Sequence, residues 1–156
     1  MRTQAARGKL RSKPSGRRGD ESFSGTAIKV IVIRQPWAWL IVNGFKDIEN
    51  RSWETRYRGP LLIQASAHRF SKEKMQEFRI YARRRKVELP KEFDLGGIVG
   101  MVRVDDCVYK SRSKWFDGPV GWVLSKPKRL PFVPLKGQLN LFDPTTRLLK
   151  KLGLSK

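Results

Sequence analysis

The stretch IRQPWAWLIVNGFKDIENRSWETRYRG, residues 33–59, constrains the fold more than any other part of the chain. Its first half opens with Pro36, which is tolerated in the first turn of a helix, and closes with Gly44, a typical helix stop. Between them, apolar side chains recur at positions i, i+3 and i+4, the period of an amphipathic helix. Trp39 lies nearly opposite that face, so it either caps another part of the core or forms an exposed aromatic surface. The apolar face consists of Trp37, Leu40 and Ile41.

The second half of the stretch alternates as a β-strand does. This alternation places Lys46 on the strand face opposite to Glu49 and Arg51. A ligand cleft that used all three side chains would therefore need a twist or a β-bulge. One face carries Asp47, Glu49, Arg51 and Trp53, and the other carries Lys46, Ile48 and Asn50.

The segments on either side of this stretch predict further strands and helices joined by tight turns. Apolar, β-branched runs are typical of buried strands, and Ser71 is a suitable N-cap for a helix. Glycines at 96, 97 and 100 suggest close backbone approach within a long strand. Strands are expected at residues 27–33, 60–66, 95–109, 120–125 and 128–134, and helices at residues 71–86 and 143–152. This pattern favours an α+β fold, a small mixed β-barrel with two or three short helices, over a doubly wound sheet.

Positive charge dominates the composition. The chain has 156 residues, which suits one domain, and a formal net charge of +20. Residues 1–25 are basic and offer no periodic apolar side chains for burial, so they predict a disordered basic arm before a folded domain at residues 26–156. The first 19 residues contribute seven cations, which leaves +13 on residues 20–156. Such a charge predicts a polyanionic partner, RNA or single-stranded nucleic acid above all.

The sequence argues against several other classes of protein. No apolar run approaches the ~18 residues that a membrane helix needs. Cys107 stands alone, so it forms neither a disulfide framework nor a thiolate metal cluster, and the single His68 has no partner for a zinc site. We therefore expect no membrane contact, no metal and no cofactor. A reducing, cytoplasmic location is the simplest interpretation, and no oligomeric state is predicted.

The residues GFKDIENR, at positions 44–51, resemble the GxKxxExR motif of the ASCH domain (activating signal cointegrator-1 homology). The surrounding segments resemble that family in the same order. The resemblance covers roughly residues 28–142, and its motif set is specific because several spaced segments agree. The supporting segments are RQPWAWLI before the motif, RSWETRYRGPLLIQAS after it, and WFDGPVGWVL at residues 115–124.

The resemblance implies a PUA-like β-barrel with short helices at its openings, which binds RNA or other nucleic acid in a cleft beside the motif. One branch of the family hydrolyses N4-acetylcytidine with a lysine, a threonine and a glutamate, and ribonuclease activity has been attributed to others. Lys46 matches that lysine, whereas Glu49 stands where the hydrolase has threonine. The third member, an acid, has only insecure counterparts, namely Asp105, Asp106 and Asp117.

The expected nucleic-acid cleft surrounds the motif. Lys46 and Arg51 would meet phosphates or base edges, while Glu49 would accept a hydrogen bond from an exocyclic amine. In the alternative interpretation, Glu49 and Arg51 only neutralise each other across the barrel mouth. Two tryptophans sit among polar neighbours and are candidates for stacking on a base. The predicted nucleic-acid-binding residues are Lys46, Glu49, Arg51, Trp53, Trp39, Arg58 and Ser66.

Other segments would extend or anchor the contact. The basic helix end at residues 79–86 and the arm would follow the ligand backbone. Trp115 and Phe116 would either touch nucleic acid or simply anchor their loop. The leading alternative function is a hydrolase of modified cytidine, or a ribonuclease, that uses Lys46 and Glu49; a protein-interaction module is the third. Against the hydrolase, an anion such as Glu49 stabilises a protonated lysine rather than a basic one.

Overall fold

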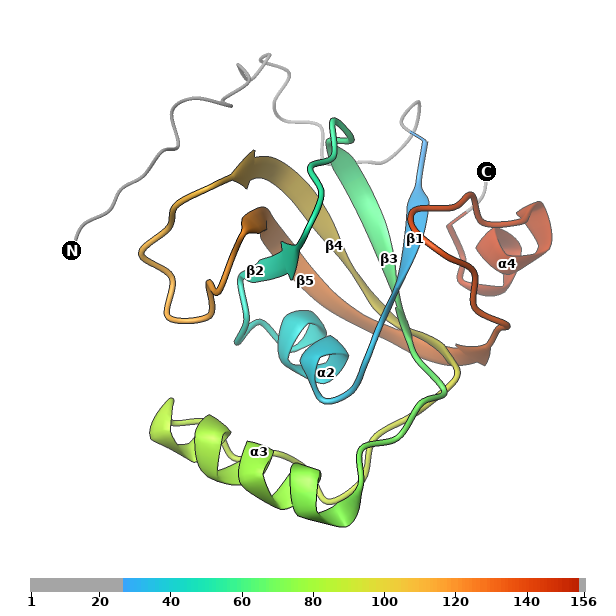
Figure 1. Ribbon diagram of the computed structural model, residues 1–156. Coiled ribbons are helices and arrows are strands. Elements are labelled where there is room, and N and C mark those ends of the chain that lie inside the picture. Colours follow the sequence, from blue (N-terminus) through green and yellow to red (C-terminus); the bar gives the residue numbers. More distant parts are fainter. Residues whose placement is uncertain (1–26, 155–156) are drawn as a thin grey trace.

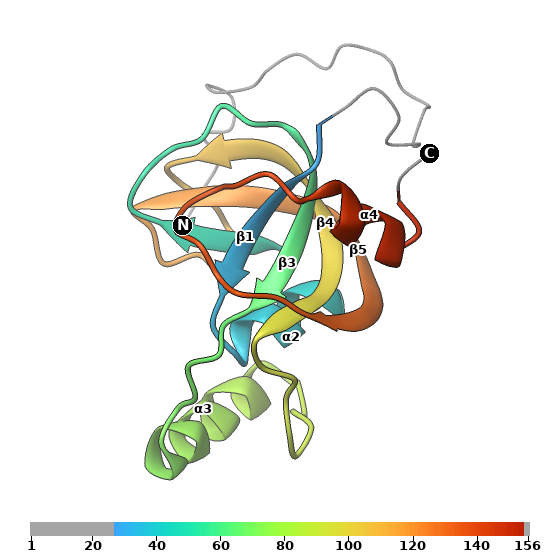
Figure 2. The same cartoon turned by 90° about the vertical axis from the view of Figure 1, so that its right-hand side faces the viewer.

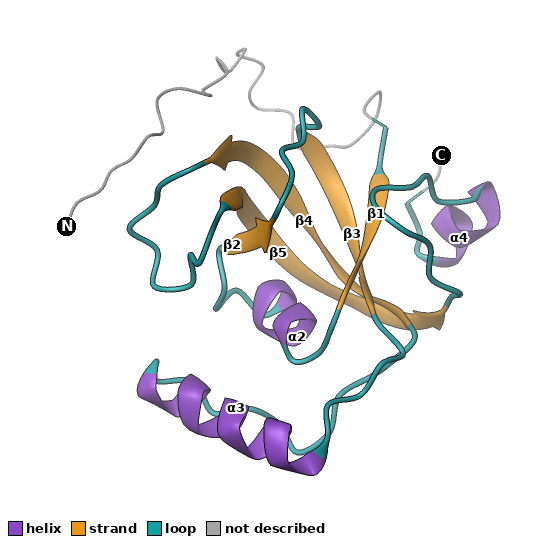
Figure 3. Ribbon diagram, in the orientation of Figure 1, coloured by secondary structure: helices purple, strands orange, loops and turns teal. Residues whose placement is uncertain are grey.

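The computed structural model describes residues 27–154, which form five strands and three helices (Figures 1 and 3). The disordered arm expected at residues 1–25 lies outside the described residues. The elements are β1 (Lys29–Ile33), α2 (Trp37–Val42), β2 (Ile48–Arg51), β3 (Gly59–Ala65), α3 (Lys72–Arg84), β4 (Gly97–Val108), β5 (Val120–Pro134) and α4 (Thr146–Lys151).

The strands form one mixed sheet in the order β1-β3-β4-β5-β2. β1 runs parallel to β3, and the other neighbours are antiparallel. Figures 1 and 2 show the sheet curling into a half-barrel around α2. β1 and β2 follow one another in the sequence but lie at opposite edges of the sheet, with α2 between them. The predicted α+β class and small mixed barrel are confirmed in this curled form.

Helices cover both faces of the sheet. On the inner face, Ile41 and Val42 of α2 pack in one apolar cluster with Ile63 of β3. On the other face, Leu148 of α4 packs in a second cluster with Leu62 of the same strand. Because successive side chains of a strand point to opposite faces, a strand covered on both sides has no solvent-facing row. This explains why every residue of β3 is buried.

The helix ends follow the predicted signals. Gly44, directly after the C-cap of α2, has φ +84°, a left-handed conformation that favours glycine. Ser71 caps α3, and its hydroxyl oxygen accepts a hydrogen bond from the amide of Lys74 at 3.1 Å. The two helices touch through Trp37 and Phe78, whose rings meet edge to face with centres 4.5 Å apart. α3 is therefore attached to the sheet through α2.

Three predicted strands have different boundaries in the structure. The strand expected at 46–53 is confined to Ile48–Arg51, so Lys46 belongs to the connection that precedes it. The two strands expected at 120–125 and 128–134 are one continuous β5. Lys126 adopts a positive φ of 52°, and the pairing of β5 with β4 shifts between Ser125 and Lys128. A β-bulge absorbs the residues that looked like a break.

The expected close approach at the glycines of β4 is present. A Cβ atom on Gly100 would lie 2.5 Å from the carbonyl oxygen of Lys128 and 2.5 Å from a methyl carbon of Val42. No side chain fits at that distance without movement of the backbone. Gly100 thus lets α2 sit directly against β4.

Tyr57 ties the loop after β2 to the start of the described chain, and its ionisation gives a test of the fold. Its hydroxyl group lies 2.5 Å from the carbonyl oxygen of Ala27 and 2.6 Å from that of Pro60, so it can donate to either. Burial raises the pKa of Tyr57 to about 12, against a smaller opposite effect of Arg103.

We expect the free energy of unfolding to fall between pH 10 and pH 12 because of this tyrosine. In that range the unfolded chain releases the Tyr57 proton while the folded chain still holds it. The variant Tyr57→Phe should show a shallower fall in urea denaturation measured at several pH values. Parallel curves for the two proteins would contradict the buried hydroxyl group.

Candidate functional site

Three charged side chains of the sequence motif form a cluster between α2, β1 and the paired strands β2 and β5. Glu49 lies at its centre, with one carboxylate oxygen 3.7 Å from Lys46 Nζ and the other 3.0 Å from Arg51 Nε. The side chains of Lys46, Glu49 and Arg51 are 2%, 11% and 23% exposed. We call these three residues the motif cluster. The expectation that Lys46 points away from Glu49 is wrong, because Lys46 precedes β2 and does not follow the strand alternation.

The surroundings of the cluster supply the partners that buried cations require. Lys46 Nζ donates a hydrogen bond to the carbonyl oxygen of Ile48 and lies 5.5 Å from the ring centre of Trp37. Arg51 Nη2 donates to the carbonyl oxygen of Val32 at 3.3 Å, and its guanidinium carbon lies 5.9 Å from the ring centre of Trp122. Both aromatic contacts are within the range of cation–π attraction. The cluster is therefore held rigidly by β1, α2 and β5.

The protonation of Lys46 reflects this burial. Loss of hydration lowers the pKa of Lys46 below its usual value, and the nearby carboxylates of Glu49, Asp117 and Asp47 offset only part of that effect. A lowered pKa is what a lysine needs to act as a catalytic base. The geometry does not match that role, because the amine is hydrogen-bonded to a backbone carbonyl group and almost fully enclosed.

Arg51 and Trp53 form the accessible side of this site. Both residues are half-buried, whereas Lys46 and Glu49 are buried. The ring of Trp53 meets Trp122 edge to face at 4.9 Å, and its carbonyl oxygen accepts a hydrogen bond from the indole nitrogen of Trp122 at 3.2 Å. The ion pair between Glu49 and Arg51 agrees with the neutralising interpretation of the motif. Glu49 nevertheless pairs with both Lys46 and Arg51, so the cluster keeps one net positive charge.

Arg58 and Ser66 are placed at opposite ends of β3. At about 3.3 Å per residue, the seven residues between them separate the two by roughly 25 Å. Arg58 donates to the carbonyl oxygens of Thr55 and Tyr57 at 2.8 and 3.0 Å and pairs with Asp106 at 3.8 Å. Ser66 accepts a hydrogen bond from the amide of His68 at 3.0 Å. These contacts hold loops, and the two residues do not share one cleft.

Trp39 lies on the side of α2 away from the motif cluster. Its ring stacks on Phe45, with centres 5.5 Å apart and planes 15° apart. It also lines a pocket of about 440 Å³ together with Asn43, Phe93 and Arg129. Trp37 packs against the core, as its place on the apolar helix face predicted, and its ring also contacts Lys46. The two tryptophans of α2 thus face different surfaces.

The loop between β4 and β5 joins the motif to the basic end of α3. Asn50 binds it through hydrogen bonds with Trp115, Asp117 and Gly118 at 2.8–3.1 Å. Trp115 is 2% exposed and packs against Tyr81 of α3, so it anchors the loop and does not offer a surface for ligands. Lys114 Nζ reaches the carbonyl oxygen of Arg85, also at the end of α3.

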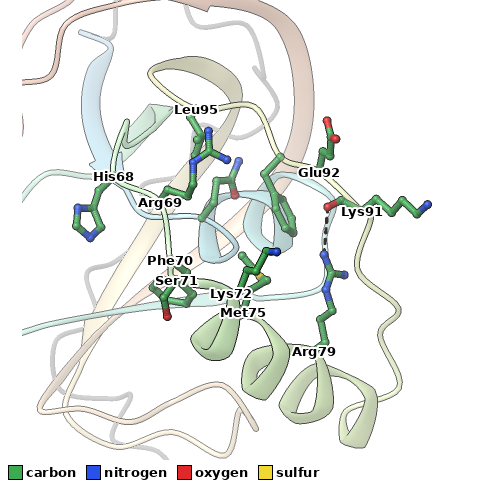
Figure 4. A pocket seen from close by; sticks show the side chains of 12 residues that line it. His68, Arg69, Phe70, Ser71, Lys72, Met75, Arg79, Lys91, Glu92 and Leu95 are labelled. Carbon is green, nitrogen blue, oxygen red and sulfur yellow. Dashed lines mark hydrogen bonds between the residues drawn. The ribbon is translucent and has the colours of Figure 1, made fainter.

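One pocket was not anticipated from the sequence. It lies at the start of α3, and it is lined by cationic and aromatic side chains (Figure 4). The signal that could have found it is the basic-aromatic run HRFSK at residues 68–72. Its opposite wall comes from residues 91–95, which are distant in the sequence.

Within residues 27–154, no three His, Cys, Asp or Glu side chains come together in a way that could hold a metal ion. In the same part of the chain, no helix is long and apolar enough to cross a membrane.

Comparison with known proteins agrees with the motif. The sequence profile of the ASCH domain matches residues 31–131. Two curated relatives, both described as activating signal cointegrator 1, come from Homo sapiens and Mus musculus and are 30% and 29% identical over 138 residues. Each match covers 80% of this chain and 24% of the relative, so the chain spans about a quarter of the length of these relatives.

Solved structures show the same fold. The crystal structure of the ASCH protein from Zymomonas mobilis superposes with a TM-score of 0.50 at 14% identity, covering 81% of this chain and 94% of that one. A single-residue variant of the same protein gives a TM-score of 0.53 at 13% identity, with the same coverage. The curled sheet and its helices are therefore of the PUA-like type.

Proposed function

This chain belongs to the ASCH domain family, and from that premise we propose that it binds single-stranded nucleic acid, with RNA as the natural candidate. The observation that carries the proposal is that the loop at residues 110–118 connects the accessible side of the motif to the basic end of α3. Arg51 and Trp53 stand at one end of it. At the other end, four side chains place positive charge on the surface. These are Arg84, Lys86, Arg112 and Lys114, all exposed.

The loop 110–118 connects the two ends. Asn50, beside the motif cluster, binds one part of this loop, and the end of α3 binds another through Arg85 and Lys114. A strand laid along the loop would meet an aromatic ring at one end and cations along its backbone. Proteins that bind single strands combine these two features, base stacking on aromatic side chains and a basic track for phosphates.

The buried part of the motif has a supporting role in this proposal. Glu49 and Lys46 fix the side chain of Arg51 and, through Trp122, that of Trp53. The hydrolase alternative fits less well, because Lys46 Nζ is enclosed and Glu49 is engaged by two cations. We extend the proposal to a cytoplasmic location, where RNA is available and Cys107 stays reduced.

We expect Arg51→Gln and Trp53→Ala to weaken binding of a labelled single-stranded RNA by about 1–3 kcal/mol each, measured by fluorescence anisotropy. The controls Lys150→Gln and Lys151→Gln on α4 each remove one charge and should change affinity little. Melting curves would verify that all four variants are folded. Equal effects at the motif and on α4 would leave only non-specific attraction by bulk charge.

A further inference from the structure

The pocket at the start of α3 has a volume of about 590 Å³, and neither Lys46, Glu49 nor Arg51 lines it. One wall is the segment before α3 together with the first turns of that helix, and the other wall is residues 91–95 (Figure 4). The volume falls within the range of small-molecule sites. The pocket is thus a second candidate site, separate from the motif cluster.

Cations outnumber anions around the pocket. Arg69, Lys72, Arg79 and Lys91 contribute positive charge, and Glu92 is the acidic residue of the lining. In Figure 4, Arg69 and Lys72 reach over the pocket, while Glu92 is directed away from Lys72. Such an excess of one sign in a recess concentrates an anionic ligand.

Three cations of the lining are available to a ligand, although in Figure 4 the side chain of Lys91 extends away from Arg69 and Lys72. Among the described residues, the side chains of Arg69, Lys72 and Lys91 make no hydrogen bond or ion pair, and all three are exposed. Arg79 is different, because its guanidinium group donates to the carbonyl oxygens of Leu89 and Lys91 at 3.4 and 3.2 Å. It therefore presents a fixed positive charge and joins α3 to the opposite wall.

Two phenylalanines and a hydrogen-bonded glutamine form another part of the lining. Phe70 and Phe93 are half-buried, and Phe93 meets Trp39 edge to face at 6.4 Å. Gln35, beneath them, donates to the carbonyl oxygen of Asp94 at 3.0 Å and accepts from the amide of Trp39 at 2.8 Å. The cations supply the charge for recognition of an anion, while the rings offer faces on which a base can stack.

We propose that this pocket binds the terminal phosphomonoester of a nucleic-acid strand or of a free nucleotide, with the attached base against Phe70 or Phe93. The inference rests on the proposed function, because it gives the nucleic-acid ligand a defined end. A phosphomonoester carries about −1.5 to −2 charges at pH 7, whereas each internal diester carries one, so clustered cations favour the terminal group.

The test compares oligonucleotides that differ only at the end. A labelled single-stranded RNA is prepared with a 5′-phosphate, with a 3′-phosphate, or with hydroxyl groups at both ends, and anisotropy gives each Kd. We expect one phosphorylated form to bind about tenfold or more tightly than the hydroxyl form, because charge-assisted hydrogen bonds are the strong ones. Competition by nucleoside monophosphate and by inorganic phosphate then shows whether the strand, the nucleotide or the phosphate alone suffices.

Variants of the lining residues test whether this pocket causes the preference for a terminal phosphate. Arg69→Gln with Lys72→Gln should reduce the ratio of the two Kd values to about one, and Lys91→Gln, on the opposite wall, should reduce it in part. The matched control Arg84→Gln removes an exposed charge from the far end of α3 and should weaken both forms equally. All of these positions are exposed, so loss of folding is not expected.

The outcomes separate the two proposals. Binding of all three RNA forms with equal Kd would overturn the phosphate site and leave nucleic-acid binding intact. A preference that survives in the Arg69/Lys72 double variant would also overturn it, because the terminal phosphate would then be bound elsewhere. If no RNA form binds at low salt, the proposed function itself fails.

Discussion

Glu49→Ala is expected to lower the free energy of unfolding by about 3–5 kcal/mol, because it leaves buried cations without their carboxylate. Lys46 is 3% exposed, and its Nζ would keep only the carbonyl group of Ile48 and the ring of Trp37 as partners. A typical domain is stable by about 5–15 kcal/mol, so the loss would be a large fraction of the total. Urea denaturation followed by tryptophan fluorescence measures it.

The matched control is Glu77→Ala, at an exposed position of α3 where the structure shows no ion pair within residues 27–154. Surface substitutions of this kind usually change stability by less than about 0.5 kcal/mol. Glu49→Gln keeps the shape of the side chain and should also destabilise strongly, which separates charge from volume. A Glu49→Ala protein as stable as the control would show that the motif cluster is open to water.

The second large effect concerns salt. If binding is mainly electrostatic, the logarithm of affinity for a single strand falls with the logarithm of salt concentration by about 0.7 per phosphate neutralised. For about five phosphates, affinity would fall about a hundredfold between 50 and 200 mM salt. Removal of residues 1–19, which carry seven of the basic side chains, should weaken binding and flatten this slope.

Anisotropy titrations at four or more salt concentrations give both slopes. Truncation of the arm should change the salt slope, whereas substitution of Trp53 should not. Loss of a stacking ring lowers affinity without changing the number of phosphates contacted. An affinity that does not depend on salt would rule out the electrostatic basis of the proposal.

Local signals in the sequence predicted most of the fold. Ser71 marked the start of α3 and Gly44 the end of α2, because capping and left-handed backbone are properties of a few neighbouring residues. The alternation of residues 46–53 was a poorer guide. The strand begins at Ile48, and a shift of two residues was enough to place Lys46 beside Glu49. Strand boundaries depend on the partner strand, here β5, and no local pattern encodes them.

The site was harder to predict, because its parts meet only in three dimensions. The sequence left open whether Trp115 touches nucleic acid or anchors its loop, and the choice depends on Tyr81, a residue distant in the sequence against which Trp115 is buried. The pocket at the start of α3 joins residues 68–72 to residues 91–95. These segments approach each other because the two ends of the chain segment that contains α3 are tied together. Gly96 donates a hydrogen bond to the carbonyl oxygen of Ala65 at 3.0 Å, directly where β3 ends and β4 begins.

The order of the strands dictates when the motif can be completed during synthesis. β2 leaves the ribosome early but has no partner until β5 is made, since it pairs with Val120–Val123. The motif cluster also cannot form before β5 is made, because the guanidinium group of Arg51 packs against the ring of Trp122 in β5. Because distant pairings of this kind form slowly, Lys46 and Glu49 of the nascent chain stay hydrated, and cannot be buried as a pair, until most of the domain has emerged. The most charged part of the core therefore cannot assemble before β5 is made.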